Sequence, residues 1–225
     1  MLAKRSQELE ILDGPTDSYT QAEYSACMKK LFQVNCWFGF FRDLKKILAK
    51  QPQNVSVLDV GCGSGLCLIH LKKAFPQMRM IGIDISHQAI TLANELAKER
   101  GIEDIIFQTH TIDTFIAENA DVIISTLVCH HIDDQGLVSF FKKIYQHADR
   151  LIVIHDLHRH SLSYFLYKLL SPMLFRNKLI THDGLISIKR GFKKQELQAL
   201  LAQANITQYT LTWKFPFRWQ LLITK

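Results

Sequence analysis

The chain of 225 residues has few of the features that mark a secreted, metal-stapled or membrane-spanning protein. Its five cysteines are an odd number and include no Cys-x-x-Cys pair, so neither a disulfide framework nor a structural zinc site is expected. No internal repeat or low-complexity tract is present. Residues 1–10 are polar and charged, without the apolar segment of a signal or transit peptide, so we expect a cytoplasmic protein of reduced cysteines.

What the chain does contain is a globular composition. Apolar residues make up 48% of it, and a chain of this length can bury about 70% of its unfolded surface in one core. The net charge of +6 would suit an anionic partner. The lysines are nevertheless spread over several predicted helices rather than gathered in a run, so no specific nucleic acid is indicated.

A glycine-rich turn follows the most regular β-branched run of the chain. The apolar stretch 57–60 ends at Gly61, Gly63 and Gly65, and a helical apolar pattern begins at Leu66. Glycines allow a ligand to lie against backbone N–H groups, and the start of the following helix adds a partial positive charge. The pattern predicts a strand, a tight turn and a helix start that together bind a ligand.

The glycine spacing narrows the choice of ligand. The dinucleotide fingerprint Gly-x-Gly-x-x-Gly would need a glycine where Leu66 stands, and no Gly-Lys-Ser/Thr closes the turn as in a P-loop. The residues resemble the first motif of class I S-adenosylmethionine-dependent methyltransferases, an acidic residue followed by Gly-x-Gly-x-Gly, here Asp59, Gly61, Gly63 and Gly65. In that family this loop, which includes Cys62, carries the methionine part of the cofactor. A turn without a ligand is the alternative.

Strands and helices alternate from residue 54 almost to the end. Strands are predicted at 55–60, 79–83, 105–109, 121–127, 151–154, 206–213 and 217–224. Most are continuous apolar runs, which indicates a parallel sheet covered on both faces, but the last two are joined too tightly to be parallel. We therefore predict an α/β fold with a doubly wound, mostly parallel seven-stranded sheet and a C-terminal antiparallel hairpin. This is the Rossmann-like architecture of class I methyltransferases, so the resemblance extends over 54–225.

The predicted domain organisation has two parts. Residues 1–50 form an N-terminal helical extension or lid, and 51–225 form the methyltransferase domain, with 156–190 as an insertion that builds the substrate pocket. The first fifteen or so residues are expected to be loosely ordered, before a capping box at Thr20 and Glu23 opens a helix. The resemblance makes three aromatic residues candidates for the lid, with core packing as the alternative: Tyr19, Tyr24 and Trp37.

The strand 79–83 ends in a candidate ribose ligand. Asp84 lies about twenty residues beyond the glycine turn, the separation expected of a carboxylate that accepts hydrogen bonds from ribose hydroxyls. The resemblance gives Asp84 the same role and places Ile85 against the adenine. Capping of the next helix, shared with Ser86, is the alternative for Asp84.

Two further sites follow from the resemblance alone. Many relatives bind the adenine amino group through an aspartate after the third strand, where this chain has Thr111 and Ile112. Either Asp113 substitutes for it or backbone groups bind the adenine. Thr126 and Leu127, at the end of the fourth strand, occupy the position that lines the methionine and the sulfonium.

Histidines are concentrated after the fourth and fifth strands. Methyl transfer is an in-line displacement that needs alignment and, for some acceptors, removal of a proton, which imidazole does well near neutral pH. The titratable groups of these two loops are His130, His131, His155, Asp156, His158 and His160. We predict His131 and His155 as general base or substrate orienter, with His130 as a third candidate, and hydrogen bonding within the loops as the alternative. No metal is expected, although the group around His155 contains ligand types that would suit one.

The segment 156–190 is long, apolar and aromatic, but too broken to span a bilayer. We infer a hydrophobic small-molecule substrate, aromatic or prenylated, methylated at oxygen or carbon. The run 155–159 and Phe192-x-x-x-Glu196-Leu197 are similar to bacterial methyltransferases of the ubiquinone/menaquinone-biosynthesis type. The competing interpretation is peripheral membrane contact through 161–178. Four cations in or next to this segment could meet anionic head groups: Arg159, Lys168, Arg176 and Lys178.

Two other functions remain open at this point. An RNA or protein methyltransferase would share the cofactor motifs, and a protein that binds S-adenosylmethionine without catalysis would share them too. The residues 125–128 lack the Asn-Pro-Pro-Tyr type of motif, which argues against methylation of DNA adenine.

Overall fold

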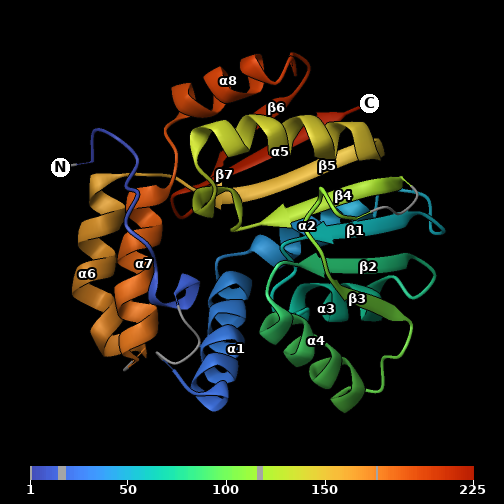
Figure 1. The fold of residues 1–225 in the computed structure, drawn as a ribbon, viewed down its shortest axis with the longest axis horizontal. Helices are drawn as coiled ribbons and strands as arrows, with labels where there is room; N and C mark the ends of the chain where they lie inside the picture. Colours follow the sequence, from blue (N-terminus) through green and yellow to red (C-terminus); the bar gives the residue numbers. More distant parts are fainter. Residues whose placement is uncertain (1, 15–18, 116–118, 176) are drawn as a thin grey trace.

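The computed structural model describes residues 2–14, 19–115, 119–175 and 177–225, and its centre is a seven-stranded sheet (Figure 1). The strands are β1 (Ser56–Val60), β2 (Arg79–Asp84), β3 (Ile105–Thr109), β4 (Ala120–Thr126), β5 (Ala148–Leu157), β6 (Thr210–Lys214) and β7 (Arg218–Thr224). Their order is β3-β2-β1-β4-β5-β7-β6, with β1 to β5 parallel and the β6–β7 hairpin antiparallel. The predicted fold is confirmed.

Helices cover both faces of the sheet. They are α1 (Gln21–Trp37), α2 (Phe40–Leu48), α3 (Leu66–Ala74), α4 (His87–Glu99), α5 (Asp134–His147), α6 (Ser161–Phe175), α7 (Lys178–Arg190) and α8 (Lys194–Gln203). Successive strand residues point to opposite faces, so Val57 belongs to the core under α2, α3 and α4, whereas Leu58 belongs to the core under α5 and α8 (Figure 1). Burial on both faces explains why the strands read as apolar runs.

Local sequence signals fix where several helices begin. Thr20 and Glu23 form the predicted capping box of α1, and the Ser86 hydroxyl accepts the Ala89 N–H at the start of α4. The Asp133 carboxylate caps α5 in the same way. Gly39, at φ 77°, separates α1 from α2, a backbone conformation that a residue with a Cβ rarely adopts.

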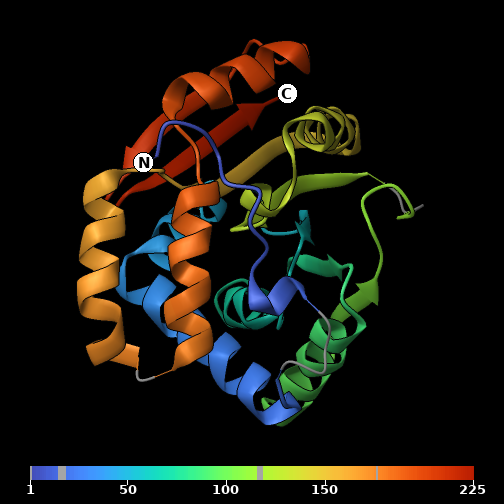
Figure 2. The ribbon, with the colours of Figure 1, turned by 60° about the vertical axis from the view of Figure 1, so that its left-hand side comes forward.

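The insertion forms a pair of helices, α6 and α7, that stands beside the sheet, and the N-terminal segment runs along α7 (Figures 1 and 2). The expectation of a loose N-terminus is wrong for residues 2–14. The Asp183 carboxylate of α7 accepts the N–H groups of Ile11 (2.9 Å) and Leu12 (3.0 Å), and the Ser6 N–H donates to the Lys189 carbonyl. The partners lie about 170 residues away in the chain, beyond the reach of local sequence patterns. Among the helices of the described part of the chain, none has the length and apolarity needed to cross a bilayer.

Candidate active site

A large cavity lies at the carboxyl ends of β1, β2 and β4, next to the point where the strand order reverses. Its volume of about 1360 Å³ exceeds the roughly 300–1,000 Å³ that suits one drug-sized ligand. Its walls come from the glycine loop, the end of β2, the loop after β4, α1, the α6–α7 pair and the N-terminal segment. The cavity therefore has room for a nucleoside cofactor and a second molecule.

The glycine loop forms one wall with its bare backbone. A Cβ on Gly61, where φ is 76°, would lie 2.3 Å from the Val128 side chain, so no larger residue fits there. Gly63 has a φ of 53° and nothing within 4 Å of a Cβ, because it borders the cavity. Cys62 lines the cavity between them, whereas Gly65 does not and instead begins α3 under Phe107. Of the predicted loop residues, Gly65 thus shapes the turn without facing the cavity.

Asp84 ties the end of β2 to the glycine loop. Its carboxylate accepts the Gly63 N–H and the Ser86 N–H, each at 2.9 Å. Asp84 lines the cavity together with Ile85, whose side chain is 77% exposed. An anionic acceptor beside an apolar surface at the mouth of the glycine loop matches the predicted positions for a ribose and an adenine.

Asp59 is a buried carboxyl with one oxygen that has no partner among the described residues. Its Oδ1 makes no hydrogen bond with the described part of the chain, and burial together with the nearby Asp84 raises its pKa to about 8. An unpaired buried carboxyl is costly unless a ligand completes its hydrogen bonding. The ammonium group of a methionine moiety is such a ligand, so Asp59 and the glycine loop fit S-adenosylmethionine.

The remaining predicted cofactor residues also border the cavity. Thr111 is exposed and exchanges hydrogen bonds with Thr114, while Ile112 adds a buried apolar surface. Asp113 forms an ion pair with Lys143, so its carboxylate is already engaged. Thr126 and Leu127 follow the end of β4 and line the cavity as well.

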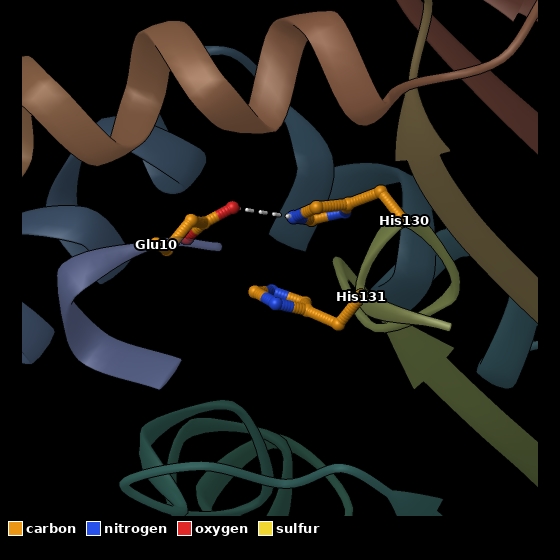
Figure 3. Close-up of side chains that lie close together, drawn as sticks. All are labelled: Glu10, His130 and His131. Atoms are coloured by element: carbon orange, nitrogen blue, oxygen red, sulfur yellow. Dashed lines mark ion pairs between the residues drawn. The ribbon is translucent and has the colours of Figure 1, made fainter. Parts of the chain in front are cut away.

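His130 is held between the carboxylates of Asp156 and Glu10, of which Figure 3 shows Glu10. Its Nδ1 lies 2.8 Å from Asp156 Oδ1, and its Nε2 lies 3.6 Å from Glu10 Oε1. Burial alone would lower the pKa of His130, but Asp156 and Glu10 outweigh it and raise the pKa to about 9. At neutral pH the ring is therefore an imidazolium that already carries its proton, which does not suit a general base.

His131 is the more accessible imidazole. Its side chain is 31% exposed and borders the cavity, and its Nδ1 lies 3.0 Å from Asp13 Oδ2. The rings of His130 and His131 lie 4.2 Å apart between centroids, and both extend toward Glu10 in Figure 3. Asp13 also accepts a bond from the Arg190 guanidinium at 2.9 Å, which fixes the carboxylate against the imidazole.

His155 lies outside the cavity. It is 3% exposed, its Nε2 is 2.7 Å from the Gln220 amide nitrogen, and Phe40 packs edge-on against its ring. Burial, and then the nearby Arg218, lower its pKa to about 3. His155 is thus a neutral ring enclosed between β5, β7 and α2, a position that does not favour the predicted role in proton transfer.

The other titratable groups at and after the end of β5 also lie apart from one another. Asp156 points to the opposite face from His155 and reaches His130. His158 accepts the Trp213 indole N–H, and His160 stacks on Phe217, both outside the cavity lining. The residues grouped around His155 in the sequence therefore do not converge on one point.

Several site residues escaped the sequence analysis. Glu10 and Asp13 come from the N-terminal segment, and Arg190 donates to the His130 and His131 carbonyls at 2.9 and 2.7 Å. The only local signal was the alternation of acidic and apolar residues in 8–13. Two of the lid candidates, Tyr19 and Tyr24, stack on each other and line the cavity, whereas Trp37 is 70% exposed and does not.

Comparisons with known proteins agree with the fold and the glycine loop. Residues 57–150 match the family described as "Methyltransferase domain". The release factor glutamine methyltransferase of Streptococcus pneumoniae is 39% identical over 72 residues, which are 32% of this chain and 25% of that protein. The chain thus spans about a quarter to a third of the length of the first curated relatives it matches.

Solved structures resemble a larger part of the chain. A SAM-dependent methyltransferase from Aquifex aeolicus has a TM-score of 0.67 at 15% identity, covering 92% of this chain and 98% of that one. Magnesium protoporphyrin IX methyltransferase from Synechocystis PCC 6803, with bound SAH, has a TM-score of 0.61 at 19% identity, covering 84% and 83%. At such identities the likeness shows the fold alone, and the family match concerns residues 57–150. Residues 57–150 thus match a methyltransferase domain, and the fold around them is that of solved S-adenosylmethionine-dependent methyltransferases.

Proposed function

We propose that the protein transfers a methyl group from S-adenosylmethionine to an oxygen or carbon of a hydrophobic small molecule. The observation that carries the proposal is that one continuous cavity joins the glycine loop and Asp84 to an apolar region. The apolar region is lined by Leu166, Leu170, Leu174, Phe175, Phe215 and Phe217. A small molecule could lie there with its reacting atom close to the cofactor end.

The cofactor end is formed by residues with separate tasks. Asp59 would pair with the methionine ammonium, the backbone of Gly61 to Gly63 would lie against the methionine, and Asp84 would accept from the ribose. Ile85 and Ile112 would flank the adenine. The cofactor supplies a methyl group on a sulfonium, so the residues mainly have to align the acceptor with it.

His131 is the residue we assign to the acceptor. Asp13 holds Nδ1 of the ring, which leaves Nε2 to take a proton from an acceptor hydroxyl. Arg190 holds Asp13 in turn, so the imidazole keeps one orientation. For a carbon acceptor the same group would remove the proton that the methyl replaces.

The part of the cavity wall that we assign to the acceptor lies outside the matched family region. The match covers 57–150, whereas the N-terminal segment, α1, α6 and α7 lie outside it. We therefore assign residues 1–50 as an extension that closes the cavity over the domain 51–225, with 156–190 as its acceptor wall. A protein acceptor, as for the release factor relative, or an RNA acceptor, as for the ribosomal RNA methyltransferase of Geobacillus, is the second candidate, but the apolar lining favours a small molecule.

The exposed side of α6 supports contact with a membrane surface. Its exposed apolar side chains that do not line the cavity are Leu162, Phe165, Leu169 and Met173. The helix contains no acidic residue, and Lys168 and Lys178 are exposed beside it, which suits anionic head groups. Arg159 was wrongly assigned to this surface, because it is buried and paired with Glu196, and Arg176 lies outside the described residues. Hydrophobic acceptors could reach the cavity from such a surface.

Calorimetric titration with S-adenosylmethionine and NADH in parallel tests the cofactor. Binding of NADH without S-adenosylmethionine would exclude the proposal. Asp13→Asn should then lower kcat for methyl transfer by about 10- to 100-fold, because the imidazole loses its orienting carboxylate, while the Kd for the cofactor stays unchanged. An unchanged kcat in a panel of phenolic and quinol acceptors would exclude the role of His131.

A further inference from the structure

We propose that Glu10, His130 and His131 bind a divalent transition-metal ion, of the zinc or iron(II) class, on the acceptor side of the cavity. One ligand atom from each of the three side chains lies within 4.8 Å of the other two. Two imidazoles and one carboxylate are a donor set that these cations favour over Mg²⁺ or Ca²⁺. The site is distinct from the group around His155 that the sequence suggested.

The spacing of the donors is close to that of a coordination sphere. Bonds of about 2.0–2.1 Å in a tetrahedral arrangement place neighbouring ligand atoms ~3.3 Å apart. His130 Nε2 and Glu10 Oε1 are already 3.6 Å apart. Small side-chain adjustments would therefore bring the donors around one cation, and the cation would displace the proton on His130 Nε2 to solvent.

An independent observation is the support behind each imidazole. His130 Nδ1 lies 2.8 Å from Asp156 Oδ1, and His131 Nδ1 lies 3.0 Å from Asp13 Oδ2. Histidines that bind metals nearly always have the second ring nitrogen held by a carboxylate, a carbonyl or water, which orients the ring and leaves the other nitrogen for the cation. Two adjacent histidines that both have carboxylate partners form a site built in this manner.

The carboxylate ligand is held in place too. Glu10 is buried and accepts a 2.6 Å hydrogen bond from the Ser187 hydroxyl of α7. The docking of Ile11 and Leu12 on Asp183 fixes the backbone directly after it. The three ligands thus come from the N-terminal segment and the loop after β4, and α7 orders both.

Glu10, His130 and His131 all line the cavity, so a cation bound by them would keep an open position toward the acceptor. Three protein ligands with one open position are typical of catalytic metal sites. This consequence rests on the proposed function: an acceptor hydroxyl bound to the cation would lose its proton to solvent more readily, and His131 would act as a ligand instead of a base.

Metal analysis of the full-length protein tests the inference. After dialysis against Zn²⁺ and then metal-free buffer, mass spectrometry should find about one equivalent, and Co²⁺ should give the visible spectrum of a four- or five-coordinate site. His131→Ala should lose the bound metal, and Asp13→Ala should weaken binding about 10- to 100-fold. His160→Ala, which changes a histidine outside the cavity, should retain it.

Titration with S-adenosylmethionine keeps the outcomes separate. Each variant that binds the cofactor like the wild type is folded, so its loss of metal reports on the site. A wild type that binds the cofactor but retains none of Zn²⁺, Fe²⁺, Co²⁺, Ni²⁺ or Mn²⁺, or a His131→Ala variant that retains a full equivalent, would overturn the inference. Retention of metal without cofactor binding would instead overturn the proposed function.

Discussion

Acidification should destabilise the protein through His155. The ring is 3% exposed, its Nε2 contacts the Gln220 amide, and its Nδ1 has no hydrogen-bond partner in the described part of the chain. Burial and the neighbouring Arg218 lower its pKa to about 3, whereas a histidine in an unfolded chain titrates near 6.5. Between about pH 3 and pH 6.5, His155 is therefore protonated in the unfolded chain but neutral in the folded protein.

The sign and size follow from this difference. Above pH 6.5 both states hold a neutral ring, so titration of His155 does not make the stability depend on pH. As the pH falls below 6.5, only the unfolded chain gains a proton, so the free energy of unfolding decreases until the pH approaches 3. Each pH unit in this window is worth about 1.4 kcal/mol, which amounts to about 2 kcal/mol at pH 5 relative to pH 7.

Urea unfolding at pH 7 and pH 5 measures the effect. The difference in free energy of unfolding between wild type and His155→Gln should change by about 2 kcal/mol between the two pH values, in the direction that makes the variant less sensitive to acid. His87→Gln, at the exposed start of α4, should follow the wild type at both pH values. Parallel losses in wild type and His155→Gln would show that His155 is not held neutral.

Four other substitutions test three separate parts of the structure. Asp84→Asn should weaken binding of S-adenosylmethionine about 10- to 100-fold by calorimetry, because a charge-assisted hydrogen bond is worth about 1.5–3 kcal/mol; an unchanged Kd would contradict its role. Gly101→Ala should lower the free energy of unfolding by about 1–2 kcal/mol, because alanine disfavours its φ of 65°. Gly61→Ala should lower it by more, because the added Cβ would also lie 2.3 Å from the Val128 side chain. Equal losses in urea unfolding would contradict the clash with Val128. Met173→Glu should reduce flotation with anionic vesicles and leave the Kd for the cofactor unchanged; undiminished flotation would exclude α6 as the membrane contact.

The sheet could be predicted because its signals are local. The strand at 105–109 was placed with the same bounds as β3, since a short apolar run ends there in both directions. β5 was predicted as 151–154 but extends over Ala148–Leu157. The residues at its ends include charged side chains that pair with neighbouring segments, as Arg150 does with Asp121. Such contacts between distant residues cannot be predicted from a local apolar run.

The cofactor end of the candidate site could be predicted from the sequence, whereas the acceptor end could not. The glycine loop and Asp84 lie about twenty residues apart, on consecutive strands of one sheet, so spacing sufficed to place them. His131 and Asp13 lie 118 residues apart, and no local sequence pattern near either residue predicts their contact. Successive side chains of β5 point to opposite faces, so Asp156 contacts His130 whereas His155 contacts Gln220. Which residue points to which face depends on the register of the strand, which the sequence does not show.

The arrangement around Asp156 shows why the acceptor side had to be assembled from distant segments. Asp156, His130 and Glu10 form a buried line from β5 through the loop after β4 to the N-terminal segment. A buried carboxylate or imidazolium is stable only when its partners are in place, so each segment needs the other two. The matched family region, 57–150, contributes only His130 to that line. Conditions that detach the N-terminal segment from α7 would therefore dismantle the acceptor side first, while the glycine loop and Asp84 keep their contacts within the sheet.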